Sequence, residues 1–95
     1  MVEFTGKLTK SGVTYKIAVP NELVNSKAMP LHQNITARIT EPEKPFKTIV
    51  PTLQGKVIRF QQGFGLVVDT AFLQGHILAQ RREYKVIVLE RKVSG

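Results

Sequence analysis

Apolar and polar residues alternate along much of this chain. Apolar residues occupy every second position in residues 13–19, 35–39 and 84–88. Alternation with a period of two is typical of β-strands that bury one face. Shorter apolar segments predict further strands at residues 4–10, 57–60 and 66–68. The pattern therefore predicts a mostly β protein with six strands.

The apolar pattern occurs twice, in residues 4–41 and again in residues 53–90. When the sequence is shifted by 49 positions, 13 of the 15 apolar residues in the first segment fall on apolar residues in the second. Only 4 of the 38 aligned positions are identical, and Gly6-Lys7 with Gly55-Lys56 accounts for two of them. An internal repeat changes how every element is assigned. The alternative is that any two alternating β segments match in this way.

Each segment has the order strand, strand, short helix, strand. Asp69-Thr70 predicts the start of the second helix and Gly75 its end, and residues 76–82 are expected to add a further helical turn. Residues 42–52 contain three prolines and form the predicted hinge. Pairing the two units covers the open edges of both. We therefore predict one domain over residues 1–95, a closed six-stranded barrel with pseudo-twofold symmetry.

The run Tyr15-Lys16-Ile17-Ala18-Val19-Pro20, followed by a short helix, resembles the swapped-hairpin transcription factors of the AbrB/MazE/SpoVT type. A chain with two such units is similar to the cradle-loop barrels, and in size and duplication it looks most like a small archaeal RIFT-type barrel. The resemblance implies a barrel fold and, through the DNA-binding members, a DNA-facing position for Lys16. In the second unit Gly65 stands in place of the basic residue and Asp69 in place of the proline. Symmetrical DNA binding is therefore not implied.

The charge balance of the chain indicates a class of binding partner. The 95 residues include 14 Lys and Arg against 7 Asp and Glu, a net charge of +7. A basic surface on so small a domain attracts polyanions, of which nucleic acid is the usual one. The absence of cysteine excludes disulfides and thiolate metal sites and suits a cytoplasmic protein. Neither a signal peptide nor an apolar run of membrane-spanning length is present, so no membrane role is expected.

The basic residues supply the candidate nucleic-acid contacts. The predicted contacts are Lys7, Lys10, Lys16, Lys56, Arg59, Arg81 and Arg82. The shift of 49 matches Lys7 and Lys10 with Lys56 and Arg59, which predicts two related basic patches. Arg81 and Arg82 are expected in a loop of the second unit. Lysine and arginine grip phosphates without reading sequence, so the prediction is non-specific binding.

A glycine-rich segment offers an alternative site. Residues 61–65 are predicted to form a turn, and its residues Gly63, Phe64 and Gly65 suit a nucleotide or flavin, although the full phosphate-binding spacing is missing. Phe60 and Phe64 are expected in the core, whereas Phe46, in the polar hinge, is a candidate for stacking on bases.

Nothing in the sequence predicts catalysis or a cofactor. His32 and His76 have no acidic or histidine partner nearby in the chain, so no metal site is expected. No cluster of titratable residues suggests acid–base chemistry. We therefore expect a monomeric, non-enzymatic barrel that binds nucleic acid. A module for a nucleotide or flavin and a protein-interaction barrel like those of translation factors stay open as alternatives.

Overall fold

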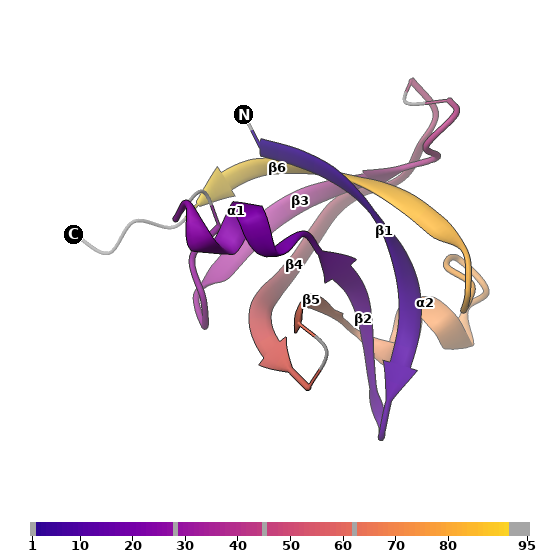
Figure 1. The fold of residues 1–95 in the computed structure, drawn as a ribbon. Helices are drawn as coiled ribbons and strands as arrows, with labels where there is room; N and C mark the ends of the chain where they lie inside the picture. Colours follow the sequence, from indigo (N-terminus) through magenta and orange to yellow (C-terminus); the bar gives the residue numbers. More distant parts are fainter. Residues whose placement is uncertain (1, 28, 45, 62, 92–95) are drawn as a thin grey trace.

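Six antiparallel strands close into a barrel in the computed structural model of this chain (Figure 1). The structure describes residues 2–27, 29–44, 46–61 and 63–91. The elements are β1 (Val2–Ser11), β2 (Thr14–Val19), α1 (Asn21–Asn25), β3 (Asn34–Thr40), β4 (Thr48–Phe60), β5 (Gly63–Val68), α2 (Thr70–Gln74) and β6 (Glu83–Arg91). Around the barrel the order is β1-β2-β5-β4-β3-β6, and β6 pairs with β1. The predicted mostly β fold, a closed six-stranded barrel, is confirmed.

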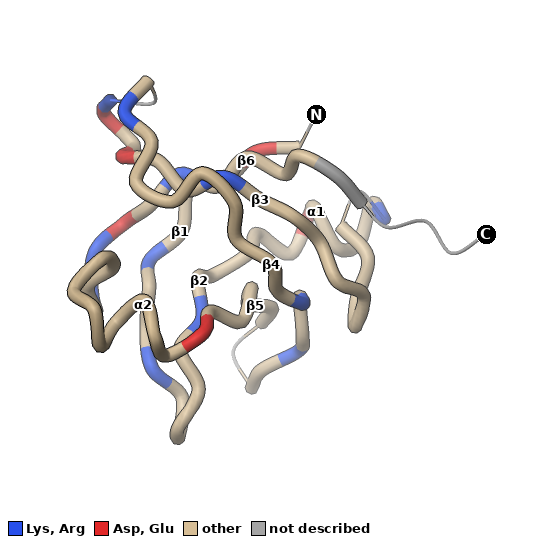
Figure 2. Tube along the Cα trace, turned by 180° about the vertical axis from the view of Figure 1, so that it is seen from behind, with Lys and Arg blue, Asp and Glu red and all other residues tan. Residues whose placement is uncertain are grey.

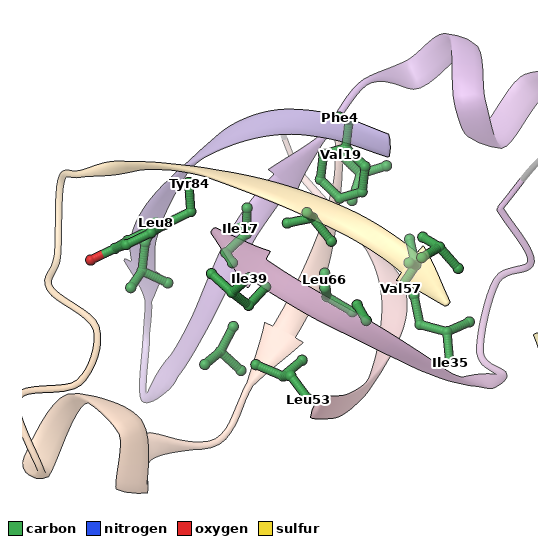
Figure 3. Close-up of a cluster of buried hydrophobic side chains, with 14 of the residues drawn as sticks. Phe4, Leu8, Ile17, Val19, Ile35, Ile39, Leu53, Val57, Leu66 and Tyr84 are labelled. Atoms are coloured by element: carbon green, nitrogen blue, oxygen red, sulfur yellow. The ribbon is translucent and has the colours of Figure 1, made fainter. Parts of the chain in front are cut away.

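The interior is filled by apolar side chains from all six strands. Alternation along each strand sends every second residue inward, and this explains the period of two in the sequence. The fully buried strand residues include Leu8, Ile17, Ile35, Ile39, Leu53, Val57, Leu66 and Val86. Figure 3 shows side chains from different strands meeting in one cluster. Each such side chain stabilises the fold by about 1.5–3 kcal/mol relative to an exposed position, so the buried set fixes the strand register.

The two halves of the chain share one spacing. The helices α1 and α2 begin and end 49 residues apart, and so do β2 and β5. Leu8 lies opposite Ile17 between β1 and β2, and Val57 lies opposite Leu66, again 49 residues further along. The strand pairing thus follows the spacing of the apolar pattern. The pseudo-twofold symmetry itself stays a prediction.

Two inward-facing glycines allow strands to cross closely. A Cβ atom on Gly6 would collide with the carbonyl oxygen of Ala18, and one on Gly55 with the carbonyl oxygen of Val67. The four residues form two pairs that are again 49 positions apart. The close backbone approach expected for these glycines is therefore present at both places.

The predicted turn at residues 61–65 is wrong in its extent. β5 begins at Gly63, so Gly63, Phe64 and Gly65 are strand residues. Phe64 has a paired residue on each side, in β2 and in β4. Pairing on both edges outweighs the low strand propensity of glycine, because that propensity depends strongly on context. No ligand loop is formed by these three residues.

The hinge is shorter than the predicted residues 42–52. β4 already begins at Thr48 and continues through Pro51. The register against β3 shifts between Val50 and Leu53, where two residues of β4 oppose one of β3. Such a β-bulge accommodates a proline because the extra residue is left out of the ladder.

The helices are single turns, as predicted. Asp69 caps α2: its carboxylate accepts a hydrogen bond of 2.9 Å from the backbone N–H of Ala71. Gly75 ends α2. The further helical turn expected after it is absent, because His76 and Arg81 have φ angles of 59° and 67°, in the left-handed region that an α-helix excludes.

Candidate nucleic-acid interface

One part of the barrel wall carries basic residues and no acidic ones. It consists of residues 7–11, 14–19, 63–68 and 56–60, from β1, β2, β5 and β4, which neighbour one another in that order. We call these four segments the basic wall. Its cations are Lys7, Lys10, Lys16, Lys56 and Arg59. Because no carboxylate belongs to the wall, nothing on it offsets the five positive charges.

Three of these cations lie on the outer face. Lys7, Lys16 and Lys56 each precede a fully buried, inward-facing residue, namely Leu8, Ile17 and Val57. Successive side chains on a strand point to opposite faces, so the three lysines face outward. Lys7 and Lys56 are exposed, and Lys16 is half-buried. The outer face thus presents three ammonium groups to solvent.

Lys10 and Arg59 belong to the opposite face. Both are exposed near the ends of hairpins. The ammonium group of Lys10 lies 5.6 Å from the centroid of the Tyr15 ring, and Tyr15 packs against the core. Residues three apart on a strand face opposite sides. The structure therefore does not join Lys7 with Lys10, or Lys56 with Arg59, in the two patches predicted from the sequence.

Lys16 lies over the strand that carries Gly65. Its ammonium group is 4.4 Å from the centroid of the Phe60 ring, on the strand beyond. A Cβ atom on Gly65 would approach the Lys16 side chain to 2.9 Å and the Phe60 ring to 3.1 Å. Gly65 is buried because these two side chains cover it. A second basic residue at position 65 would have no room, which accounts for the asymmetry seen in the sequence.

Arg81 and Arg82 extend the basic wall along the edge of β1. The backbone N–H of Arg81 donates to the carbonyl oxygen of Leu8 at 2.7 Å, and the N–H of Leu8 donates to the carbonyl oxygen of Arg82 at 2.9 Å. Both arginine side chains are exposed. In Figure 2 the basic segment that precedes β6 lies beside the basic segments of β1. The backbone of both arginines is thus hydrogen-bonded to Leu8, a buried residue of the basic wall.

Carboxylates mark where the basic surface ends. Glu83 lies opposite Lys7 in the pairing of β6 with β1. Further along the same pair of strands, Lys85 and Glu3 form an ion pair of 3.3 Å. This pair is partly exposed and contributes at most about 1 kcal/mol to folding. The cationic face therefore extends from β1 toward β2, β5 and β4, and not toward β6.

Sequence reasoning misplaced one aromatic residue of this face. Phe60 was expected in the core, but it is half-buried and stacks with Lys16 on the outer side. Phe64 packs against the core as predicted, and Phe46 is 84% exposed in the hinge. Strand alternation could have placed Phe60 correctly. It stands three residues after the inward-facing Val57, and residues three apart on a strand lie on opposite faces.

Two hollows flank the loop that joins α2 to β6. The larger, of about 580 Å³, has Ile77, Tyr84 and hinge residues among its lining. The smaller, of about 310 Å³, is lined by Tyr15, Leu73, His76, Leu78, Ala79 and Gln80.

The part of the chain that the structure describes holds neither a metal-binding cluster nor a membrane-spanning helix. There, no three His, Asp or Glu side chains gather as ligands for a metal ion. Neither described helix is long and apolar enough to cross a membrane.

Comparison with known proteins adds no relative to this picture. No protein-family model, curated protein or solved structure matches the chain.

Proposed function

We propose that this protein is a small basic barrel that binds nucleic acid without reading its sequence. In this proposal the chain belongs with the cradle-loop barrels of RIFT type and works in the cytoplasm. It acts by binding and not by catalysis, and it needs no metal or cofactor.

The observation that carries the proposal is the basic wall with the two arginines docked on its edge. Lys7, Lys16 and Lys56 share its outer face, and Arg81 and Arg82 are fixed beside it by hydrogen bonds to Leu8. Cations spread over several strands, with a carboxylate only at the border where Glu83 lies opposite Lys7, suit a chain of phosphates. Phe60 adds an aromatic ring within the same face, on which a base can stack.

The absence of base readout in this proposal follows from the size of the helices. α1 and α2 have five residues each, too short to lie along a major groove as a recognition helix does. Contacts from lysine and arginine to phosphate carry no sequence information. Affinity should therefore vary little among sequences and fall steeply with salt.

A salt titration tests the proposal. Fluorescence anisotropy with labelled duplex DNA, single-stranded DNA and RNA would be measured from about 50 to 300 mM salt. Four to five phosphate contacts give a log–log slope of about −4 on duplex DNA and about −3 on single strands. No binding tighter than about 100 μM at the lowest salt would exclude the proposal, since non-specific binders typically reach 100 to 1 μM even at physiological salt.

A matched pair of double variants assigns the face. Lys7→Ala with Lys16→Ala removes two charges from the wall, and we expect the duplex slope to flatten by about 1.5 to 2. Arg38→Ala with Lys47→Ala removes two exposed charges outside the wall and should leave the slope nearly unchanged. Equal losses in both double variants would mean that net charge alone attracts the nucleic acid.

A further inference from the structure

The smaller hollow has the dimensions of a small-ligand site. Its volume of about 310 Å³ lies at the lower end of the range for such sites, roughly 300–1,000 Å³. It is bounded by β2 at Tyr15, by the end of α2 at Leu73 and by the loop that follows α2. We call this hollow, lined by Tyr15, Leu73, His76, Leu78, Ala79 and Gln80, the Tyr15 pocket.

The walls combine apolar and aromatic surface with a cationic rim. Leu73 and Leu78 supply apolar surface, and Tyr15 supplies an aromatic ring. The ammonium group of Lys10 lies 5.6 Å from the centroid of that ring. Arg81 follows the lining residue Gln80 and is hydrogen-bonded through its backbone to the strand that carries Lys10. None of the lining residues is acidic, and Lys10 and Arg81 stand next to lining residues, so the pocket suits a flat ring attached to an anionic group.

The backbone at the rim of the pocket adopts left-handed φ angles at two residues that are not glycine. His76 and Arg81 have φ angles of 59° and 67°, a region that glycine adopts most easily. Lys27 and His32, 49 residues earlier, have φ angles of 64° and 61°, so this backbone conformation occurs in both halves of the chain. The side chains of His76 and Arg81 are exposed beside the pocket.

The first half of the chain has a different residue at the matching position. Forty-nine residues before Gln80 stands Leu31, which is partly buried, packs against the core and forms an isolated bridge with Val57. Gln80 is exposed and lines the pocket. An apolar side chain that covers the core in one half is thus replaced by a polar side chain at the rim of a hollow in the other.

We propose that the Tyr15 pocket takes one unstacked nucleotide. The base lies against the Tyr15 ring, and its phosphate faces Lys10 and Arg81. This site rests on the proposed function in one respect, because a bound single strand would be one source of the nucleotide. A free nucleoside monophosphate has the same chemistry and is the other source. Duplex DNA is excluded, since its bases are paired and stacked.

Backbone NMR with mononucleotides tests the pocket directly. Adenosine 5′-monophosphate and cytidine 5′-monophosphate would be titrated into the ¹⁵N-labelled protein, with ribose 5-phosphate as the probe that lacks a base. We expect both nucleotides to shift the amide signals of Tyr15 and of residues 73–81, and ribose 5-phosphate to shift them far less. Equal shifts with all three probes would show a phosphate site only and would overturn the proposal.

Gln80→Leu replaces the polar lining residue Gln80 by the residue type found at the matching position, Leu31. Because Gln80 is exposed, the variant should fold, and it should weaken mononucleotide binding about tenfold. Gln54→Leu, the same change at an exposed residue of β4 outside the lining, should leave it unchanged. Mononucleotide binding that is equally strong in Gln80→Leu and in the unmodified protein would refute the pocket.

One anisotropy experiment distinguishes a bound single strand from a free nucleotide as the source of the base. It also tests the Tyr15 pocket separately from the basic wall. Anisotropy with Gln80→Leu should show weaker binding to single strands and unchanged binding to duplex DNA if a strand inserts a base. If only mononucleotide binding weakens, the pocket serves free nucleotides. If the pocket proposal fails, salt-dependent binding to duplex DNA is unaffected, and the proposed function still stands. Conversely, nucleotide binding without any duplex or single-strand binding would keep the pocket and remove the basic wall as an interface.

Discussion

The ammonium group of Lys16 lies 4.4 Å from the centroid of the Phe60 ring. Lys16 belongs to β2 and Phe60 to β4, and β5 runs between them with Gly65 at the crossing point. The contact exists because Gly65 has no side chain. A cation over an aromatic ring at this distance is attracted by about 0.5–1 kcal/mol at an exposed site. It also holds Lys16 in place on the outer face of the barrel.

The Lys16–Phe60 contact makes Gly65→Ala destabilising. A methyl group would approach the Lys16 side chain to 2.9 Å and the Phe60 ring to 3.1 Å, so both must move. We expect a loss of about 1–2 kcal/mol in the free energy of unfolding, measured by urea denaturation. In the double variant Gly65→Ala with Lys16→Ala, part of the loss should return, with a coupling of at least about 0.5 kcal/mol. Strictly additive losses would show that the two residues do not interact.

Gly6→Ala and Gly55→Ala should be the most damaging glycine substitutions. In each case the new methyl group collides with a backbone carbonyl oxygen of another strand, of Ala18 or of Val67. Backbone shifts inside a closed barrel are costly, and we expect losses of about 3 kcal/mol, at the upper end of the usual range for overpacking, read from urea denaturation.

Gly12→Asn is the control for these two substitutions. Gly12 has open space around it and a φ of 63°, which asparagine tolerates. Its expected change in stability is within about 0.5 kcal/mol. Comparable losses at Gly12 and at Gly6 would contradict the close strand crossing.

The sequence allowed the barrel to be predicted because its strands carry the signal on their buried faces. Tyr15, Ile17 and Val19 occupy alternate positions, and Phe64, Leu66 and Val68 occupy the matching positions 49 residues later. The extent of β5 was missed because Gly63 and Gly65 favour turns locally, whereas pairing with β2 and β4 decides the outcome. Propensity is a weak guide where both edges of a strand are paired.

The candidate interface was predictable as a set of residues and only in part as an arrangement. The seven basic residues were visible in the sequence, and alternation along the predicted strand at residues 4–10 was enough to place Lys7 and Lys10 on opposite faces. The contact of Lys16 with Phe60 depends on the strand order β2-β5-β4, which joins the two halves of the chain. The docking of Arg81 on Leu8 depends in the same way on tertiary contacts that no local pattern encodes.

Asp69→Ala should reduce stability by about 1 kcal/mol, because it removes the hydrogen bond to the N–H of Ala71 at the start of α2. The control is Asn21→Ala at α1, where Pro20 is the N-cap residue and no side-chain cap is present. That change should cost no more than about 0.5 kcal/mol. Thermal unfolding followed by circular dichroism measures both. Equal effects at the two helices would show that the cap at α2 contributes nothing specific.

The protein should be monomeric in dilute solution. The barrel closes within one chain, since β6 pairs with β1 and every strand has a neighbour on both sides. Sedimentation equilibrium at micromolar concentration should give a mass near 10.7 kDa. Twice that mass would indicate exchange of units between chains through the hinge, a known route to dimers.

A circular permutation tests whether the two halves are equivalent units. The permuted chain begins at Thr48, runs to Arg91, continues through a Gly/Ser linker of the hinge's length to Val2, and ends at Thr40. Every strand pairing of the barrel is retained, because the cut falls between β3 and β4 and the new link joins β6 to β1. If the units are equivalent, the linker takes the place of the hinge, and the permuted chain should give nearly the same ¹⁵N–¹H spectrum. A second permutation, opened between Val68 and Asp69, cuts one unit in two and should be less stable to urea. A hinge permutant that fails to fold, alongside a folded second permutant, would contradict the repeat.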